Sequence, residues 1–357
     1  MFTIRAQQLL IGLLVFFLFS GVKLFQVHAA IPAVEREALI ALYNSTDGAN
    51  WTNNSGWKEP PLDVDGFAMP GMENTWFGVT TDVGNTTVTS IGLSRNHLAG
   101  SIPSELGNLF NLEGILLEFN QLTGTIPIQL GNLANLINLD LQGNLLTGNI
   151  PAELGNLTHL EGLDLRQNRL TGNIPVEIAS LSSLEGLVLT FNQLTGEIPA
   201  ELGNLASLLV LRLDNNQLTG RIPAELGNLA NIYLLELFNN QLTGSIPLEL
   251  GNLANLEWLD VSNNQLSGMV PSELGNLSNL LALKFNDNEL RGMIPLELIN
   301  LTTLWDNFSD ICGNHLLTKN EALRDFLNSK QIGGDWDSCQ SPPFSFYNPG
   351  VLLLLSY

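Results

Sequence analysis

One short phrase recurs nine times in this chain at a constant spacing of 24 residues; the first copy begins at Leu98 and the last at Leu290. A fixed period of this length indicates units that stack on one another, because a single unit cannot bury its own apolar residues. Burying a Leu or Ile contributes roughly 1.5 to 3 kcal/mol, against roughly 1 to 2 kcal/mol of backbone entropy for each ordered residue. The 357 residues are therefore predicted to form one elongated domain.

The complete phrase, Leu-x-x-Leu-x-Leu-x-x-Asn-x-Leu-Thr-Gly-x-Ile-Pro-x-x-Leu-Gly-Asn-Leu-x-x, is a leucine-rich repeat. Successive residues of a strand face opposite sides, so Ile115 and Leu117 are predicted to point inward while Leu116 and Glu118 point outward. The Leu-Gly-Asn-Leu stretch is predicted to form a short helical turn on the convex side. The expected fold is an α/β solenoid, a right-handed superhelix of 24-residue leucine-rich repeats with a parallel β-sheet on its concave face.

One asparagine in each repeat lies where the chain turns from the strand into the interior. A buried amide is tolerated only when backbone groups of adjacent repeats form hydrogen bonds with it. We therefore expect a buried row of amides, consisting of Asn96, Asn120, Asn144, Asn168, Asn192, Asn216, Asn240, Asn264 and Asn288.

The flanks of the repeats predict the domain boundaries. A basic residue, an apolar run and a small-residue cleavage site match a secretory signal peptide over residues 1–29. We expect an N-terminal cap at 30–87, nine repeats at 88–305, a C-terminal cap at 306–340 and a disordered tail at 341–357. The protein is thus predicted to be secreted, with no transmembrane span of its own after signal cleavage; an uncleaved membrane anchor is the alternative.

Two cysteines are present, Cys312 and Cys339, and both follow the last repeat. A disulfide between them agrees with a secreted protein and would stabilise the C-terminal cap by roughly 3 to 4 kcal/mol; two free thiols are the alternative. Acceptor motifs for N-glycosylation occur at Asn44, Asn50, Asn53, Asn85, Asn156, Asn276, Asn300 and Asn307.

The segment before the repeats contains a helical pattern over residues 35–43 and three tryptophans, Trp51, Trp57 and Trp76. We expect the tryptophans to pack over the first repeat, with a carbohydrate platform as the alternative.

The repeat phrase, preceded by Trp76-Phe77-Gly78-Val79, resembles the plant-type extracellular leucine-rich repeat family. That family includes ectodomains of receptor kinases and receptor-like proteins and the secreted polygalacturonase inhibitors. It brackets the Trp-x-Gly-Val element with cysteines, where this chain has Asn74 and Thr81. The sequence from Asn44 to Thr52 is instead similar to that of leucine-rich repeat proteins of algae, other protists and some bacteria.

The resemblance implies that ligands bind to the concave sheet, where the outward-facing residues differ between repeats. Aromatic side chains on that face have no core to fill, and aromatic residues are frequent at interface hot spots. For Phe119 and Phe191, packing against neighbouring turns is the alternative. The residues expected to contact a ligand are Phe119, Asp140, Asp164, Arg166, Phe191, Arg212, Phe238 and Trp258.

No catalytic activity is predicted. Asp140 and Asp164 on adjacent strands would lie about 5 Å apart, which suits a glycosidase or a cation site, but no pocket or further ligands are evident. The four histidines lack metal-ligand spacing, and we expect neither a metal nor a cofactor. The net charge of −21 argues against nucleic acid as a partner, because its phosphates require Lys and Arg.

Three functions are compatible with these features. The leading prediction is a secreted or cell-surface recognition module that binds a protein, peptide or glycan, with a membrane receptor among its partners. The second is an inhibitor of an extracellular cell-wall hydrolase, with a role in defence. The third is a structural or ice-binding solenoid, suggested by the threonines that recur once per repeat: Thr123, Thr147, Thr171, Thr195, Thr219 and Thr243.

Overall fold

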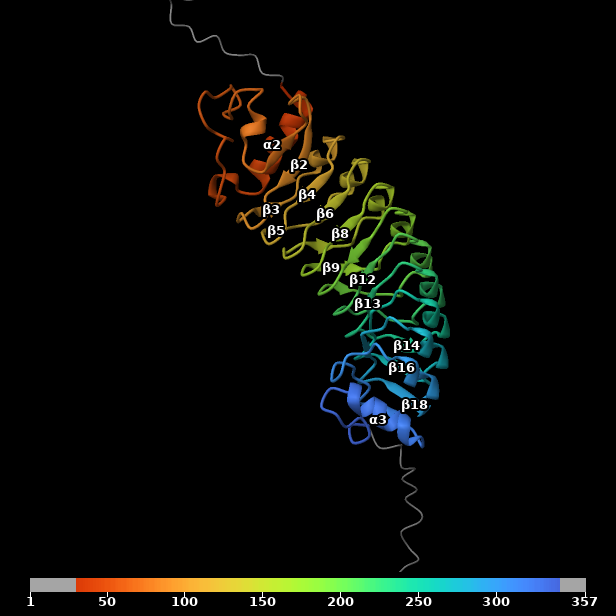
Figure 1. Cartoon of the computed structure of the whole chain (residues 1–357). Coiled ribbons are helices and arrows are strands. Elements are labelled where there is room, and N and C mark those ends of the chain that lie inside the picture. Colours follow the sequence, from red (N-terminus) through yellow and green to blue (C-terminus); the bar gives the residue numbers. More distant parts are fainter. Residues whose placement is uncertain (1–29, 341–357) are drawn as a thin grey trace, which may run out of the picture.

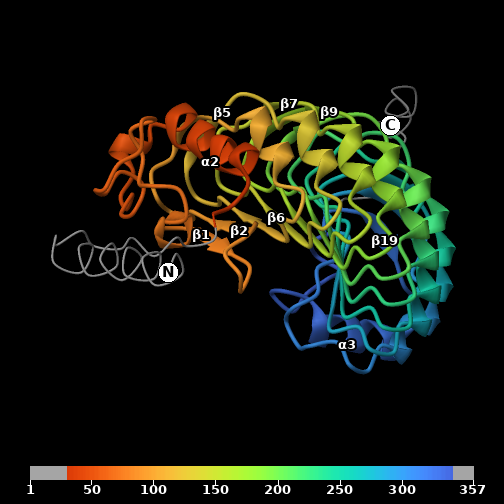
Figure 2. The ribbon, with the colours of Figure 1, turned by 90° about the horizontal axis from the view of Figure 1, so that it is seen from above.

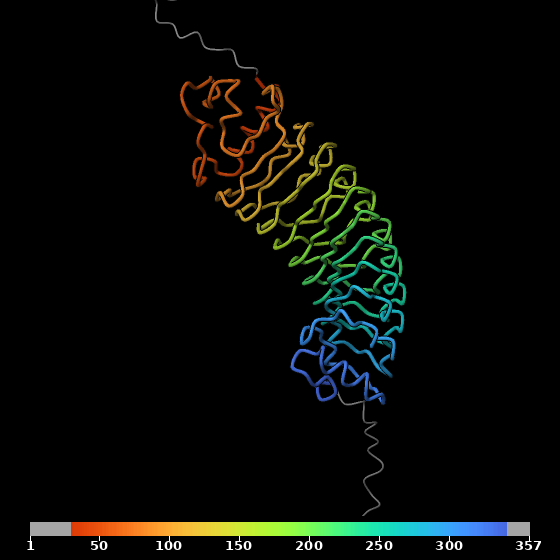
Figure 3. The backbone as a smooth tube through the Cα atoms, viewed as in Figure 1, coloured from red at the N-terminus to blue at the C-terminus, as the bar shows by residue number. Residues whose placement is uncertain are grey.

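The computed structural model describes residues 30–340; the predicted signal peptide and C-terminal tail lie outside this range. The described residues form a curved solenoid of stacked coils with a cap at each end (Figure 1). The backbone tube in Figure 3 shows the coils following one another along the axis. Each coil contributes a strand to the concave sheet and a turn of 3-10 helix to the convex side, so the predicted α/β solenoid is confirmed.

The concave face is a ten-stranded sheet in which every neighbouring pair is parallel except β1 and β2. Corresponding residues of successive coils pair in register, as Asp140 does with Asp164. The strands in order are β1 (Val79–Thr81), β2 (Val88–Gly92), β4 (Gly114–Leu116), β6 (Asn138–Asp140), β8 (Gly162–Asp164), β10 (Gly186–Val188), β12 (Val210–Arg212), β13 (Leu234–Glu236), β15 (Trp258–Asp260) and β17 (Ala282–Lys284).

A second row of short strands follows the concave sheet in the chain, at the Leu-Thr-Gly part of the repeat. These strands form small sheets of parallel neighbours. They are β3 (Ala99–Ser101), β5 (Gln121–Thr123), β7 (Thr147–Gly148), β9 (Arg169–Gly172), β11 (Gln193–Leu194), β14 (Thr243–Gly244), β16 (Gln265–Gly268), β18 (Glu289–Met293) and β19 (His315–Leu317).

Short 3-10 helices lie along the outer, convex edge of the arc (Figure 2). Each one begins directly after the proline of an Ile-Pro or Val-Pro pair, whose fixed φ suits entry to the turn and whose missing N–H is not needed there. They are η3 (Ser104–Asn108), η4 (Ile128–Asn132), η5 (Ala152–Asn156), η6 (Val176–Ser180), η7 (Ala200–Asn204), η8 (Ala224–Asn228), η9 (Leu248–Asn252), η10 (Ser272–Asn276) and η11 (Leu296–Asn300). Asn156, Asn276 and Asn300 end three of these helices and are exposed, and glycosylation there stays a prediction.

The interior is one continuous apolar core with a row of amides beside it. Asn168 illustrates the row: its Oδ1 accepts from Leu146 N at 3.0 Å, while its Nδ2 donates to Leu141 O at 2.9 Å and to Leu165 O at 3.1 Å. The first two partners belong to the preceding coil and the third to its own, so each amide joins two coils. The predicted asparagine row is therefore confirmed, with seven of its nine members buried and Asn240 and Asn264 half-buried.

The N-terminal cap consists of α2 (Ala33–Ser45), η1 (Gly48–Asn50), η2 (Glu73–Thr75) and an aromatic cluster. Trp51, Trp57 and Trp76 are buried, and the Trp57 and Trp76 ring centroids lie 4.6 Å apart. The alternative of a carbohydrate platform was therefore wrong, because these indole rings present no face to solvent.

The C-terminal cap closes the other end of the core with α3 (Glu321–Lys330). Asn320 Oδ1 caps this helix by accepting from Leu323 N at 2.9 Å. Cys312 and Cys339 form a disulfide, as expected. Within residues 30–340 no helix has the length and apolarity needed to cross a bilayer.

Candidate functional site

The predicted ligand-binding residues occupy two zones of the concave face. Four of them, Asp140, Asp164, Arg212 and Trp258, lie on the concave strands β6, β8, β12 and β15. The other four, Phe119, Arg166, Phe191 and Phe238, follow the ends of their strands, at the edge where the chain leaves the sheet. The strand residues form three contact groups rather than one continuous site.

The first group joins Asp140 and Asp164 through a polar row. Arg166 Nε lies 3.2 Å from Asp164 Oδ2 and donates to Gln142 Oε1 at 2.8 Å. Gln142 Nε2 in turn donates to Asp140 Oδ2 at 2.9 Å. These contacts fix the carboxylates in place before any ligand arrives.

The carboxylates of this face are only partly neutralised. Burial raises the pKa of Asp164 to about 6, although the Arg166 backbone N–H and guanidinium oppose the increase. Burial also raises the pKa of Asp140, Glu236 and Asp260 above their usual range. A cationic ligand group would favour the ionised form of each carboxyl, so this surface suits positive charge.

The second group surrounds Arg212, which forms an ion pair with Glu236. Arg212 Nε also lies 3.7 Å from Oδ1 of Asp214, whose residue is fully buried. Asp214 accepts hydrogen bonds at 2.8 Å from Thr190 Oγ1 and from Asn215 Nδ2. The charged side chains of this network pair with one another. Arg212 lies on β12, between the strands that carry the other two groups.

The third group is an aromatic cluster around Trp258 at the C-terminal end of the sheet. The Trp258 and Phe308 ring centroids lie 5.2 Å apart, and those of Trp305 and Phe308 lie 5.3 Å apart. Lys284 Nζ lies 5.1 Å from the Trp258 ring centroid and 5.4 Å from that of Phe308. Trp258 Nε1 is buried and has no hydrogen-bond partner within residues 30–340.

Trp305 and Phe308 are not among the predicted residues, because the spacing changes after the last repeat. Asp310 pairs with Lys284 across the sheet, an offset of 26 residues instead of 24. Phe308 therefore corresponds to the small Ala282, and it contacts Trp258 across that residue. The same shift is present in the sequence, where Asn314 and Leu316 follow Asn288 and Leu290 by 26 residues, and aligning these residues would have found it.

A column of glutamates also escaped the prediction. The residue just before each of several concave strands is an exposed glutamate, and aligning that column would have found it. Its members are Glu113, Glu161, Glu185 and Glu257. They add to the negative charge along the edge of the concave sheet.

Phe119 and Phe191 have left-handed backbones, with φ of 55° and 54°. This conformation costs a residue with a side chain roughly 1 to 2 kcal/mol, and other coils place Gly143 or Asn215 at the same position. The Arg95 guanidinium lies 3.9 Å from the Phe119 ring centroid, so Phe119 does pack against a neighbouring turn. Phe191 is 53% exposed.

No group of three or more metal-ligating side chains occurs within residues 30–340. A hollow of about 760 Å³ lies on the flank of the solenoid, and neither Asp140 nor Asp164 lines it.

Comparison with known proteins places the repeats in a family. The model for the Leucine Rich Repeat matches residues 87–109, 135–157, 159–181, 183–205, 207–229, 231–253 and 255–277. The chain is a leucine-rich repeat protein. No curated protein matches its sequence.

Among solved structures, the leucine-rich repeat protein is similar to the ectodomain of the membrane receptor kinase GASSHO1/SCHENGEN3 from Arabidopsis thaliana, in complex with CASPARIAN STRIP INTEGRITY FACTOR 2. The identity is 36% and the TM-score 0.74, over 83% of this chain and 34% of that chain. The ectodomain of the Arabidopsis receptor kinase HAESA, in complex with an IDA peptide hormone, gives 37% identity and a TM-score of 0.60, over 68% and 41%.

A plant ice-binding protein gives 27% identity and a TM-score of 0.60, over 81% of this chain and 96% of that chain. By contrast, the leucine-rich repeat protein spans only about a third of the GASSHO1 chain. The resemblance to plant-type extracellular leucine-rich repeat proteins is confirmed.

Proposed function

We propose that this protein is a non-catalytic extracellular recognition module whose concave face binds a peptide that carries basic residues. The observation that most supports this proposal is the combination of incompletely neutralised carboxylates and an aromatic cluster on the concave face. Asp140 and Asp164 would contact the cationic side chains of the peptide, while Trp258 and Phe308 would contact its apolar ones.

Two kinds of observation support this assignment. The HAESA ectodomain, which shares the fold, was solved with a peptide hormone ligand, and the GASSHO1 ectodomain was solved with CASPARIAN STRIP INTEGRITY FACTOR 2. An extracellular location is supported by the disulfide between Cys312 and Cys339, since such bonds persist mainly in oxidising compartments. Secretion through residues 1–29 remains part of the proposal.

The test is a selection from a displayed library of random twelve-residue peptides, followed by calorimetry on the enriched sequences. We expect enrichment of Lys and Arg together with apolar residues. Trp258→Ala should weaken binding roughly tenfold or more, because buried aromatic contacts dominate interface energies. Glu153→Gln, an exposed change on the convex η5, is the matched control and should have no effect. Enriched peptides without basic residues, or full affinity in Trp258→Ala, would contradict the proposal.

Ice binding is a second candidate function, supported by the likeness that covers nearly the whole plant ice-binding protein. The exposed threonines of the second strand row are held rigidly: Thr123 Oγ1 donates to Gly100 O at 3.1 Å, and Thr147 Oγ1 donates to Gly124 O at 3.2 Å. A parallel row of polar side chains flanks them, formed by Gln121, Arg169, Gln193, Gln217, Gln241 and Gln265.

Thermal hysteresis measurements separate the two candidates. Ice binding predicts hysteresis that disappears in the variant Thr147→Lys with Thr195→Lys and persists in Trp258→Ala. Absence of hysteresis in the unmodified protein would remove this candidate and leave peptide binding unaffected. Inhibition of a cell-wall hydrolase stays a prediction from the sequence resemblance, and an assay of such an enzyme with and without the protein would decide it.

A further inference from the structure

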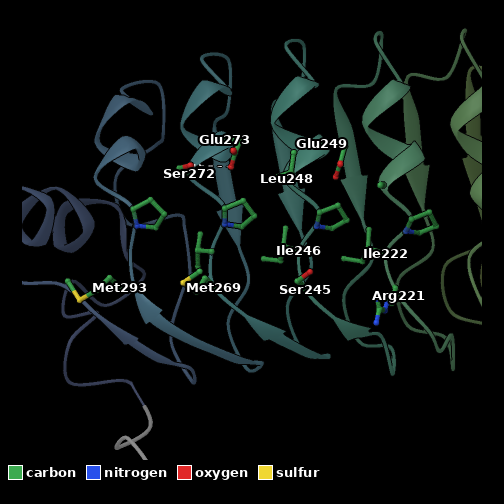
Figure 4. A pocket seen from close by; sticks show the side chains of 16 residues that line it. Arg221, Ile222, Ser245, Ile246, Leu248, Glu249, Met269, Ser272, Glu273 and Met293 are labelled. Atoms are coloured by element: carbon green, nitrogen blue, oxygen red, sulfur yellow. Dashed lines mark hydrogen bonds between the residues drawn. The ribbon is translucent and has the colours of Figure 1, made fainter.

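A groove runs along the flank of the solenoid, between the second row of strands and the 3-10 helices (Figure 4). We call it the flank groove; a hollow of about 760 Å³ within it is lined by residues from Arg221 to Pro295. A further hollow of about 660 Å³, lined from Glu197 to Thr243, adjoins it and shares Arg221 and Pro223. Prolines of successive Ile-Pro or Val-Pro pairs form part of the lining, as the row of rings in Figure 4 shows.

The strand side of the flank groove is unusually apolar. Met269 and Met293 are apolar residues at a solvent-exposed position of the repeat, where they are 69% and 46% exposed. Earlier coils have polar residues at this position of the repeat, namely Thr125, Asn149, Asn173 and Glu197. The exposed Leu317 pairs in register with Met293 and continues the apolar row onto β19.

On the helix side, Leu248 lines the flank groove. Leu248 and Leu296 begin η9 and η11, and both are about half exposed. Large apolar side chains that gather on one surface mark interaction sites, and methionine is favoured where a surface must adapt to its ligand. These apolar residues come from consecutive coils, so they form one patch rather than scattered exceptions.

An acidic rim borders the same groove on its helix side. It consists of Glu201, Glu225, Glu249 and Glu273, one from each of four consecutive coils. None of these carboxylates forms an ion pair within residues 30–340, and Arg221 is the cation that the lining supplies. The groove therefore combines apolar contacts with an excess of negative charge.

We propose that the flank groove binds an extended segment of a partner protein that alternates apolar and basic residues. The apolar side chains would contact Met269, Met293 and Leu248, and the basic ones would contact the acidic rim. A chain running along the solenoid axis crosses one coil about every 4.8 Å, so it passes several copies of the same rim. This site is separate from the concave face, so both surfaces can be occupied together.

Charge argues against a second copy of this chain as the occupant. A symmetric dimer through the groove would place the same patch on both sides of the contact. Glu249 and Glu273 of the two copies would then approach one another, and the chain as a whole carries a net charge of −21. A basic partner removes this repulsion.

The probe is a fluorescent ten-residue peptide that alternates Leu and Lys, with one Leu replaced by a photoactivatable analogue. Cross-links mapped by mass spectrometry on the full chain are expected at residues 245–297 of the flank groove. Fluorescence anisotropy should show binding at least roughly tenfold tighter than for the peptide that alternates Ser and Lys. Cross-links confined to concave residues would overturn the proposal without affecting the proposed function.

Variants test the two parts of the recognition separately. Met269→Ser with Met293→Ser should weaken binding roughly tenfold, whereas Asn149→Ser with Asn173→Ser, the same positions in earlier coils, should not. Glu249→Gln with Glu273→Gln should weaken binding and reduce its dependence on salt. Unchanged affinity in the methionine variant would overturn the proposal. So would a dimer in sedimentation that this variant converts to monomer, because the occupant would then be a second copy.

Discussion

At the scale of single residues, the concave carboxylates are the groups that couple this surface to pH. The pKa of Asp164, about 6, lies above the 3.8 of the free side chain, so the folded protein holds this proton more tightly than the unfolded chain. The resulting stabilisation is complete below about pH 4 and is lost as the pH rises through 6. The cause is burial, which penalises the charged form more than Arg166 compensates.

The variant Asp164→Asn removes this titration. It should match the unmodified protein near pH 3.5 and exceed its stability at pH 7 by roughly 1 to 2 kcal/mol, because it buries no charge. Urea denaturation at several pH values measures the difference. The control is Glu161→Gln, an exposed neighbour at the edge of the sheet. A difference that does not change with pH would refute the assignment.

The row of amides supports a second prediction at this scale. Asn168→Ala would leave the buried N–H of Leu146 without its partner, whereas the carbonyl oxygen of Leu141 would still accept from Asn144 Nδ2. An unsatisfied buried group costs about 1 to 3 kcal/mol, so we expect a loss in this range in the free energy of unfolding. Asn138→Ala, an exposed asparagine on β6, should cost less than about 0.5 kcal/mol. Equal losses in both would show that the row carries no special stability.

At the scale of elements, α2 is held in the N-terminal cap by a buried ion pair instead of a disulfide. Arg36 Nη1 donates to Glu73 Oε1 at 2.5 Å, and Arg36 Nη2 donates to the carbonyl oxygen of Ala68 at 2.6 Å. These bonds connect the helix to the segment before β1, where the resembling family has a cysteine and this chain has Asn74. The cap is thus closed by charge and aromatic packing.

Arg36→Met should destabilise the cap by about 3 to 5 kcal/mol, because it leaves the buried Glu73 unpaired. The fluorescence of Trp57 and Trp76, which lie in this cap, reports its unfolding on heating. Adding Glu73→Gln to Arg36→Met should restore much of the lost stability, since residue 73 then carries no unpaired buried charge. An unchanged transition in Arg36→Met would show that the ion pair does not hold the cap.

At the scale of the whole molecule, stability is a sum over neighbouring coils, because each coil contacts only the coils beside it. Deleting residues 193–216 joins Asn192 to Gln217 and restores the repeat phrase without a break. The shortened protein should fold with both caps, and its sheet should be about 4.8 Å shorter. Circular dichroism and small-angle X-ray scattering check this. Deleting residues 193–204, half a coil, should prevent folding, and a folded half-coil deletion would contradict the stacking model.

The repeat phrase was sufficient to predict the architecture because each of its recurring residues has one structural role. The period predicted the parallel sheet, and the asparagine column predicted the amide row through Asn168 and its counterparts. The candidate site was predictable only in part. Asp140 and Asp164 were correctly placed on adjacent strands, but Phe308 was missed because the offset between strands changes beyond the last repeat.

Period, spacing and residue type were enough to predict the solenoid, the disulfide pair and the columns of residues that face outward. How those columns combine depends on the folded arrangement of the coils. Burial sets the raised pKa of Asp164, a shifted strand pairing brings Phe308 to Trp258, and stacking turns Met269 and Leu248 into one groove. These properties depend on distances between coils, which a one-dimensional pattern does not contain.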